Sequence, residues 1–417
     1  MANGSANGSP TRGSHTICVP APEEQYASLV QDPGRFRAWL EGAARQSPEL
    51  FPDGFAQGFR MKDVYRSKKL PGLCLRRVEL RDGRAYTVRP SFVLPYLTAR
   101  AADAERGLFL RRFGVPFWAL ARVLGRDPMY WFRLECGLGC NSVVGTTVRR
   151  AEVPRHLLAD EHHQTRDGRK VYLATTVGGG CCLGVGVAAS AGAEDLAAAY
   201  GVFLGEARDV SPGYAPGTVN TDGWQGTRAA WAALVPAVVL LRCFLHGWLK
   251  VRDRAKNLGQ AFYDLSARVW DAYHAPDKRG FAQRLRRLRE WAGRNLAGGV
   301  VLAAVLDLCD KKGLWLAAYD HPQGHRTSNA LDRVMRPMYR YYFDGQHLHG
   351  HRMTGRHARA WALLWNFAPW APATVRSNDG WRSPAERLNR HRYHDNWLQN
   401  LLISASLGGY RRAPQNP

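Results

Sequence analysis

The stretch His156-Leu-Leu-Ala-Asp160 begins the part of the chain that decides the fold, and it is an apolar run that ends in a carboxylate. Asp167-Gly168 then predicts a tight turn between two paired strands. The segments that follow are strands at 170–177 and 182–189, a helix at 194–205, the short strand Thr218-Val-Asn-Thr-Asp222, a helix at 226–234 and a buried strand at 235–244. This order of elements predicts an α/β fold in which helices flank a mixed sheet.

The sheet is the first part of a core, expected at 151–246, that a helical segment interrupts. Residues 247–326 have helical patterns throughout and are basic, with 15 Lys and Arg against 8 Asp and Glu. We therefore predict an all-α insertion domain there, after which residues 327–390 complete the core. The end of the chain is also basic, and residues 391–417 are expected to form a basic C-terminal tail.

Ahead of this core, residues 19–150 are expected to form a DNA-binding region. Within it, helical patterns at 23–30 and 35–45 precede a strand-like pattern at 75–88 that turns at Asp82-Gly83. Residues 1–18 begin with a Gly-, Ser- and Asn-rich segment and are expected to be a disordered tail.

A helix-turn-helix is predicted near 103–136. Its helices are expected at 103–113, 117–124 and 129–135. Glycines separate them, and Asp127 is placed to cap the third. In such a motif the third helix enters the major groove, so Arg126, Tyr130 and Arg133 are predicted to contact DNA. The alternative is an ordinary packing of three helices that makes no DNA contact.

The charge of the chain favours a polyanionic partner. The 58 Lys and Arg against 35 Asp and Glu give a net charge of +23 and a pI near 10.1, which points first to nucleic acid. No uninterrupted apolar run approaches the roughly 20 residues that span a bilayer, so no membrane partner is expected. The eight cysteines are too sparse for a disulfide scaffold and predict reduced thiols in a cytosolic setting.

Two carboxylates, Asp160 and Asp222, each end a strand-like stretch. Neighbouring strand ends can bring two side chains to one point, and two divalent ions about 3.5–4 Å apart require shared carboxylates. Asp332 lies in the first turns of a predicted helix and could complete such a site, since Mg²⁺ needs few carboxylates. Glu161 should point to the opposite face from Asp160, because side chains alternate along a strand. The alternative is that these are solvated surface aspartates, which are common at strand ends.

Four segments resemble parts of insertion-sequence transposases related to Mutator-like elements. The block Thr-Ser-Asn-Ala-Leu-Asp at 327–332 falls in the positions of the family's T-T/S-N-x-x-E motif, with Asp in place of the usual Glu. Cys243-Phe-Leu-His246 is similar to the C-x-x-H signature that follows the second Asp in Mutator-like and hAT-like transposases. The helical block at 247–326 resembles their all-α insertion domain, and Ser383-Pro-Ala-Glu-Arg-Leu388 is similar to a segment near transposase C termini.

The resemblance implies a DNA transposase of the DDE/DDD kind with an RNase H-like core. Asp160, Asp222 and Asp332 would be catalytic and would bind two Mg²⁺ or Mn²⁺ ions. The implied partners are double-stranded DNA, as element ends and target, and further copies of the chain in a dimeric or larger synaptic complex. The implied location is the bacterial cytoplasm, in association with the nucleoid. The other implied residues are Cys243, His246 and Asn329 near the active site, and Arg326 and Arg333 against DNA.

Two other functions remain open at this point. One is an RNase H-like structure-specific nuclease that cuts without joining, and the other is a non-enzymatic DNA-binding protein derived from a transposase. Because Asp is one methylene shorter than Glu, the helix that carries Asp332 must lie closer to a metal, or a water must intervene. Asp344 and Glu290 are the reserve candidates for the third ligand.

Overall fold

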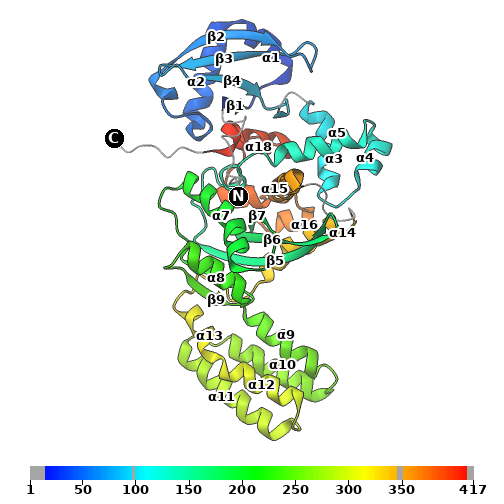
Figure 1. Cartoon of the computed structure of the whole chain (residues 1–417). Helices are drawn as coiled ribbons and strands as arrows, with labels where there is room; N and C mark the ends of the chain where they lie inside the picture. The colour runs from blue at the N-terminus through cyan, green and yellow to red at the C-terminus, as the bar shows by residue number, and fades with distance from the viewer. Residues whose placement is uncertain (1–14, 96–98, 345–350, 411–417) are drawn as a thin grey trace, which may run out of the picture.

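The computed structural model of the chain describes residues 15–95, 99–344 and 351–410. Figure 1 shows three parts in line: an N-terminal sheet with its helices at one end, a larger sheet in the middle, and a bundle of helices at the other end. The first residues of the expected disordered tail, 1–14, and the end of the expected basic tail, 411–417, lie outside the described residues.

The middle part is a five-stranded mixed sheet whose elements follow in the predicted order. Its strands are β5 (His156–Arg166), β6 (Arg169–Gly178), β7 (Cys181–Ala188), β8 (Thr218–Thr221) and β9 (Val239–Arg242), and its crossover helices are α7 (Ala193–Val210) and α8 (Gln225–Leu234). The strand order is β7-β6-β5-β8-β9, with β5, β8 and β9 parallel and β6 antiparallel to both its neighbours. The predicted α/β class with a mixed sheet is confirmed.

The turn between β5 and β6 explains why the sequence predicted this hairpin. Asp167 and Gly168 both have positive φ, at 47° and 76°. A two-residue turn of this kind matches the twist of antiparallel strands, and Asp-Gly is a favoured pair for it. Pairing of Arg166 with Arg169 closes the hairpin directly.

Each face of the sheet has its own apolar core. Leu157 and Ala159 belong to the core that contains Tyr200 of α7 and Trp231 of α8. The alternate residue Leu158 belongs to the other core. That second face is covered by α14 (Asn329–Asp344) and α15 (His351–Phe367), which pack against β5, β6 and β7. The predicted strand at 235–244 is shorter than expected, because a turn that contains Pro236 precedes β9.

The N-terminal part contains a second sheet, of which the sequence predicted only the hairpin. Its strands are β1 (Thr16–Val19), β2 (Phe59–Arg66), β3 (Cys74–Leu80) and β4 (Ala85–Pro90), and its helices are α1 (Glu23–Gln31) and α2 (Pro33–Gln46). The order is β1-β4-β3-β2, and β1 runs parallel to β4. The Asp82-Gly83 turn joins β3 to β4 as predicted, with Gly83 at a φ of 81°.

The boundary of the expected disordered tail at residue 18 is wrong. Residues 16–19 form β1, and Ile17, Cys18 and Val19 are fully buried. The Gly-, Ser- and Asn-rich composition belongs to the residues before this strand. A strand of only four residues, paired in parallel with a segment about seventy positions later, leaves no local signal that sets it apart from the tail.

Three helices connect the two sheets, at the positions predicted for the helix-turn-helix. They are α3 (Ala101–Arg111), α4 (Phe117–Leu124) and α5 (Pro128–Leu138), followed by the short α6 (Val143–Thr147). Gly114 and Gly125, which separate these helices, each have positive φ. The Asp127 carboxylate accepts a hydrogen bond from the Met129 N–H at 2.7 Å. The breaks and caps therefore follow the sequence signals closely.

A helical segment follows β9 and has a core of its own. Its helices are α9 (Phe244–Ala255), α10 (Gln260–Tyr273), α11 (Lys278–Asn295), α12 (Val300–Asp310) and α13 (Lys312–Leu316), with a 3₁₀ turn at Ala317–Tyr319. Phe244, Trp248 and Phe281 are buried at its centre. Residues 244–319 are all described and contain no strand, which agrees with the helical pattern predicted there. Within the described residues, no helix is both long enough and apolar enough to cross a bilayer.

The expected basic tail at 391–417 is wrong for its first twenty residues. The described part of the chain ends with α16 (Pro372–Arg376), α17 (Pro384–Asn389), α18 (Trp397–Ser404) and a 3₁₀ turn, η6 (Ser406–Gly409). Leu398, Leu401 and Ile403 are completely buried, and α18 and η6 pack against β1 (Figure 1). The arginines on either side of this apolar run dominated the composition and masked it.

The C-terminal segment, α18 with η6, joins the N-terminal sheet to the segment that precedes β5 through polar contacts. The Ser406 hydroxyl accepts from the Cys18 N–H at 3.0 Å and donates to the Leu50 carbonyl at 2.6 Å. The buried Arg149 guanidinium donates to the carbonyls of Ser404 and Ser406 at 2.5 and 2.6 Å. These bonds satisfy groups that no regular element pairs.

Asn389, at the end of α17, is expected to be sensitive to substitution. Its side-chain oxygen accepts from the N–H groups of Arg149, Arg150 and Ala151, and its nitrogen donates to the carbonyls of Thr147 and Ala385. Asn389→Ala should lower the free energy of unfolding by about 2 kcal/mol, since several part-buried groups lose their partner. Urea denaturation followed by tryptophan fluorescence measures this. A loss no larger than that of the exposed Asn295→Ala would contradict it.

Candidate active site

The parallel pairing of β5 with β8 brings Asp160 and Asp222 side by side. In this pairing Leu158 lies opposite Asn220, and each aspartate follows two residues later in its own segment. Residues two apart in an extended chain share a face, and neighbouring strands lie about 4.8 Å apart. Both carboxylates therefore belong to the same face, at the point where β8 ends at Thr221.

The sequence predicted that Asp160 ends its strand, and this prediction is wrong. β5 continues to Arg166 in pairing with β6, whereas its other neighbour β8 stops. Asp160 thus lies at a step in the sheet, where one strand continues and the next one ends. Such a step opens one side of the carboxylate while the continuing strand holds its backbone.

The two aspartates repel each other in partly desolvated surroundings. Burial raises the pKa of the Asp160 carboxyl to about 7, and the negative charge of Asp222 adds to the effect. The Glu161 N–H, which donates to Asp160 Oδ1 at 2.8 Å, opposes it. Asp222 Oδ1 accepts the Trp224 N–H at 2.7 Å. A bound cation would relieve this repulsion, because positive charge favours both ionised forms.

Gly223 makes the turn that follows Asp222. Its φ is 96°, in the region that favours glycine. A Cβ at this position would lie 2.8 Å from Nε of Arg242. The turn therefore requires glycine both for its backbone conformation and for the close approach of Arg242 from β9.

Glu161 points away from the pair, in agreement with the strand alternation. Its carboxylate accepts hydrogen bonds from the Tyr200 hydroxyl of α7 at 2.6 Å and from the Thr227 hydroxyl of α8 at 2.7 Å. Burial raises the pKa of this carboxyl group against the effect of the two hydroxyls. Glu161 thus ties β5 to the two crossover helices on the far face of the sheet.

Three hydrogen bonds fasten residues 325–328 to the ends of β8 and β9. Asn220 Nδ2 donates to the His325 carbonyl at 2.7 Å, and the Phe244 N–H donates to the Arg326 carbonyl at 3.0 Å. The Ser328 N–H donates to the Cys243 sulfur at 3.2 Å. Because α14 begins at Asn329, these bonds fix where the helix starts relative to the paired aspartates.

Asp332 lies in the first turn of α14 and is exposed to solvent. The Ser328 hydroxyl donates a hydrogen bond to its carboxylate at 3.1 Å. Among the described residues, no three His, Cys, Asp or Glu side chains are close enough together to hold a metal ion. The structure thus brings Asp160 and Asp222 together, and the role of Asp332 as the third metal ligand stays a prediction.

The reserve ligands add no alternative. Glu290 lies on α11 in the helical segment, 3.8 Å from Arg286 in an exposed ion pair. The side chain of Asp344 lies outside the described residues.

Cys243 and His246 influence each other's ionisation beside the pair. Burial alone would raise the pKa of the Cys243 thiol, but hydrogen bonding with His246 and Ser328 outweighs it and holds this pKa below its usual value. The same hydrogen bond raises the pKa of the His246 imidazole, with burial opposing and Asp160 and Asp222 contributing. This electrostatic coupling agrees with the prediction that Cys243 and His246 lie near the aspartates.

Cys243 offers a test of how the start of α14 is fixed. Cys243→Ala removes the acceptor of the Ser328 N–H and leaves that buried group unpaired, which should lower the free energy of unfolding by about 1–2 kcal/mol. Cys243→Ser keeps an acceptor and should lose less. Chemical denaturation of both variants measures the difference. Equal losses would mean that volume, and not the hydrogen bond, matters at this position.

The residues predicted to contact DNA divide into two groups. Arg126 and Arg133 are exposed on the three-helix unit, with the Arg126 guanidinium 5.7 Å from the Tyr130 ring centre. Arg333 is exposed on α14. By contrast, Arg326 lies 4.5 Å from the ring centres of both Tyr273 and Tyr319 and donates to the Tyr319 hydroxyl at 2.9 Å.

Arg326 therefore has a structural role, because it holds α10 and the end of the helical segment against the start of α14. The sequence offered no sign of this, because the two tyrosines are 53 and 7 residues away. Asn220 was also missed. The one available signal was an amide inside a strand whose neighbours are buried, since a buried amide must find partners.

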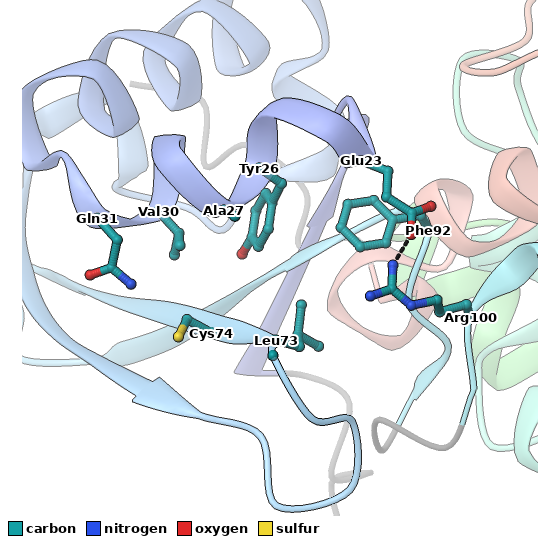
Figure 2. Close-up of a pocket in the computed structure, with 10 residues that line it drawn as sticks. Glu23, Tyr26, Ala27, Val30, Gln31, Leu73, Cys74, Phe92 and Arg100 are labelled. Atoms are coloured by element: carbon teal, nitrogen blue, oxygen red, sulfur yellow. Dashed lines mark ion pairs between the residues drawn. The ribbon is translucent and has the colours of Figure 1, made fainter.

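Two cavities of the structure lie away from the paired aspartates. Figure 2 shows one of about 110 Å³ between α1 and β3, lined by Tyr26 and Cys74, with the Glu23–Arg100 ion pair at one end. A broader one of about 500 Å³ is lined by residues at 151–155 and 210–215. It lies where β5 and β8 begin, at the opposite end of these strands from the aspartates.

Comparison of the chain with models of known protein families gives no match, and comparison with curated proteins gives none either.

Proposed function

We propose that the protein is a DNA transposase of the DDE/DDD kind, in which an RNase H-like core uses divalent metal ions to cleave phosphodiester bonds and join the freed 3′-hydroxyl to target DNA. The observation that carries the proposal is the pair formed by Asp160 and Asp222. They share a face on neighbouring parallel strands, at the point where β8 ends, and burial, to which the charge of Asp222 adds, raises the pKa of Asp160 to about 7. This is the electrostatic environment that a divalent cation stabilises.

The residues present suit Mg²⁺ or Mn²⁺. Carboxylate oxygens are the preferred ligands of these ions, and few are required when phosphate and water complete the shell. Asp160 and Asp222 would bind them, with Asp332 as the proposed third ligand. Ions bound there would activate water or a 3′-hydroxyl and stabilise the leaving oxygen. The chain's own part is to hold the carboxylates in register and to fix the start of α14.

The contacts around residues 325–328 support the assignment of Asp332. Asn220, Cys243 and Phe244 all bind this short segment, which directly precedes α14. They tie the helix that carries the proposed third acid to the two strands next to the first two. To complete the site, the exposed Asp332 side chain would have to reach a bound metal directly or through an intervening water.

Binding of double-stranded DNA is proposed for the three-helix unit, in the manner of a helix-turn-helix. Arg126 and Arg133 are exposed on this unit and Arg333 is exposed on α14, and the net charge of +23 favours association with a polyanion. Two element ends must be brought together before joining, so we also propose a dimeric or larger complex on DNA.

The test is a cleavage and joining assay on a linear fragment that carries the gene with its natural flanking DNA on both sides. With Mg²⁺, the protein should nick the flanks and join the ends to a target plasmid. Asp222→Asn and Asp332→Asn should reduce both reactions by at least 10³-fold while DNA binding in EDTA is kept, as expected for loss of metal ligands. Glu290→Gln, a matched carboxylate on α11, should be as active as the parent.

The outcomes separate the candidate functions. Cutting without joining would favour a structure-specific nuclease on the same fold. Binding without cutting, in Mg²⁺ and in Mn²⁺, would favour a DNA-binding protein derived from a transposase. Full activity of Asp222→Asn would remove the proposed site altogether.

A further inference from the structure

The outward face of α14 combines aromatic and basic side chains in line with Asp332. The inward face is apolar and buried, with Leu331, Val334 and Met338 in the core. The outward residues recur at helical spacing and are exposed: Asp332, Arg333, Arg336, Tyr339, Arg340 and Phe343. We refer to these six residues as the α14 face.

Two aromatic rings on the α14 face are stacked and open to solvent. Tyr339 is 43% exposed and Phe343 is 58% exposed, and their ring centres lie 5.8 Å apart with the planes inclined by 19°. Large aromatic side chains normally bury their area. Tyr339, at 43% exposure, forfeits part of that stabilisation, which a flat ring stacked on it would restore.

The aromatic surface continues toward the paired aspartates through β5. The His162 ring meets Tyr339 edge to face, with ring centres 4.7 Å apart. His162 follows Asp160 by two residues on β5 and therefore shares its face. Asp160 and His162 thus lie on one face of β5, and His162 contacts the first of the two exposed rings.

The charges flanking the rings are positive. Arg336 and Arg340 are exposed one turn apart on the α14 face, and Arg336 precedes Tyr339 by three positions. Guanidinium groups beside flat aromatic rings are suited to a chain that carries phosphates and bases in alternation. A protein partner of apolar chemistry would instead leave these arginines against an apolar surface.

We infer that the α14 face binds an unpaired stretch of DNA next to the bond being cut, with bases stacked on Tyr339 and Phe343 and phosphates on Arg336 and Arg340. Unpaired DNA is favoured over duplex because ring faces can stack only on bases that have left the helical stack. The inference rests on the proposed function for its location beside a scissile bond, but the binding itself is measurable without catalysis.

The experiment measures binding of a fluorescent 20-nucleotide single strand and of the same sequence as a duplex, by anisotropy in EDTA. Stacking on one side chain changes affinity by roughly 5- to 150-fold. Tyr339→Ala and Phe343→Ala should therefore each weaken single-strand binding by about 10-fold and change duplex binding by less than about 2-fold. Tyr339→Phe should bind like the parent.

Tyr263→Ala is the matched control, because Tyr263 is a 67% exposed tyrosine on α10, in the helical segment. It should leave single-strand binding unchanged. A strand with one 2-aminopurine reports stacking directly, through quenching that Tyr339→Ala should reduce and Tyr263→Ala should not. Thermal melting of each variant checks that the fold is kept.

Equal weakening of single-strand and duplex binding would overturn the inference in favour of a duplex contact, and unchanged single-strand binding in both alanine variants would overturn it outright. The result is independent of the cleavage assay. Single-strand binding that depends on Tyr339, in a protein that neither cuts nor joins DNA, would reject the transposase proposal and keep this one. If Asp222→Asn abolished cleavage while Tyr339→Ala and Phe343→Ala changed neither cleavage nor single-strand binding, the transposase proposal would be kept and this inference rejected.

Discussion

Asp160→Asn is expected to abolish DNA cleavage and, in the absence of divalent ions, to make the protein more resistant to unfolding above pH 7. The loss of activity, at least 10³-fold, follows from removal of a charged metal ligand. The gain in stability follows from the position of this carboxylate, which is half-buried and faces Asp222. A variant that is both inactive and more stable separates a functional residue from a structural one.

The direction of the pH dependence follows from the raised pKa. The pKa of Asp160 is about 7 in the folded protein and near its ordinary value of 3.8 when unfolded, so the folded state binds the proton more tightly. Stability should therefore fall as pH rises from about 4 to about 7 and level off above that. The difference corresponds to at most roughly 4 kcal/mol, and relaxation of the site will reduce it.

Thermal melting in EDTA between pH 4 and pH 9 measures the effect. The parent should lose more stability over this range than Asp160→Asn, and Mg²⁺ should stabilise the parent selectively at the alkaline end. The exposed Asp264→Asn serves as the control and should follow the parent. A lower melting temperature of Asp160→Asn at every pH would show that the carboxylate stabilises the fold and would contradict the assignment.

The second large effect is expected at Glu135, which is completely buried on α5. Its carboxylate accepts from Arg111 Nε at 2.6 Å and from the Tyr341 hydroxyl, and it lies 3.2 Å from His357 Nε2. Burial alone would raise the pKa of Glu135, but the charge of Arg111 and the interaction with His357 outweigh it and lower this pKa to about 2. The ionised pair thus joins the three-helix unit to α14 and α15.

Glu135→Ala should lower the free energy of unfolding by roughly 3–5 kcal/mol, because Arg111 would remain buried without its carboxylate. The double variant Arg111→Met/Glu135→Leu should regain most of this loss. Glu290→Gln, which breaks an exposed pair, should cost less than about 0.5 kcal/mol. Since the folded pKa is depressed, the contribution of the pair is present above about pH 4.5 and is lost as pH falls toward 2.

Urea denaturation at pH 7 measures all three variants, and near-ultraviolet circular dichroism reports whether the aromatic residues around Tyr341 keep their packing. If the double variant were as unstable as Glu135→Ala, the loss would come from packing and not from the unpaired arginine. The same variants also test whether the three-helix unit and α14 unfold together.

The parts of the fold that the sequence predicted are those with local signals. The β5–β6 hairpin is marked by Asp167-Gly168, and α3, α4 and α5 are separated by Gly114 and Gly125. In each case one or two residues adopt a conformation that few others can. The order of strands and helices around Asp160 and Asp222 follows from hydrophobic patterns of sufficient length.

The missed parts depend on partners far along the chain. β1 is too short to stand out, and its pairing with β4 is a tertiary contact. α18 is apolar but lies among arginines, and only its packing against β1, α3 and α15 shows it to be core. In the site, the pairing register of β5 with β8 explains why two aspartates 62 residues apart meet. No local pattern fixes how far Asp332 lies from them, because a long helical segment separates it from β9 in the sequence.

The C-terminal segment also determines when the protein can finish folding during its synthesis. The Cys18 N–H finds its acceptor in Ser406, 388 residues later, and Arg149 likewise waits for Ser404. At about 5–20 residues per second, the ribosome needs roughly 20–80 s to supply these partners. Until then the β1 edge of the N-terminal sheet is uncovered and open to pairing with other chains. Nascent chains on neighbouring ribosomes of one message would therefore be the first hazard for this fold, and a chaperone that shields β1 should raise the yield of intact protein.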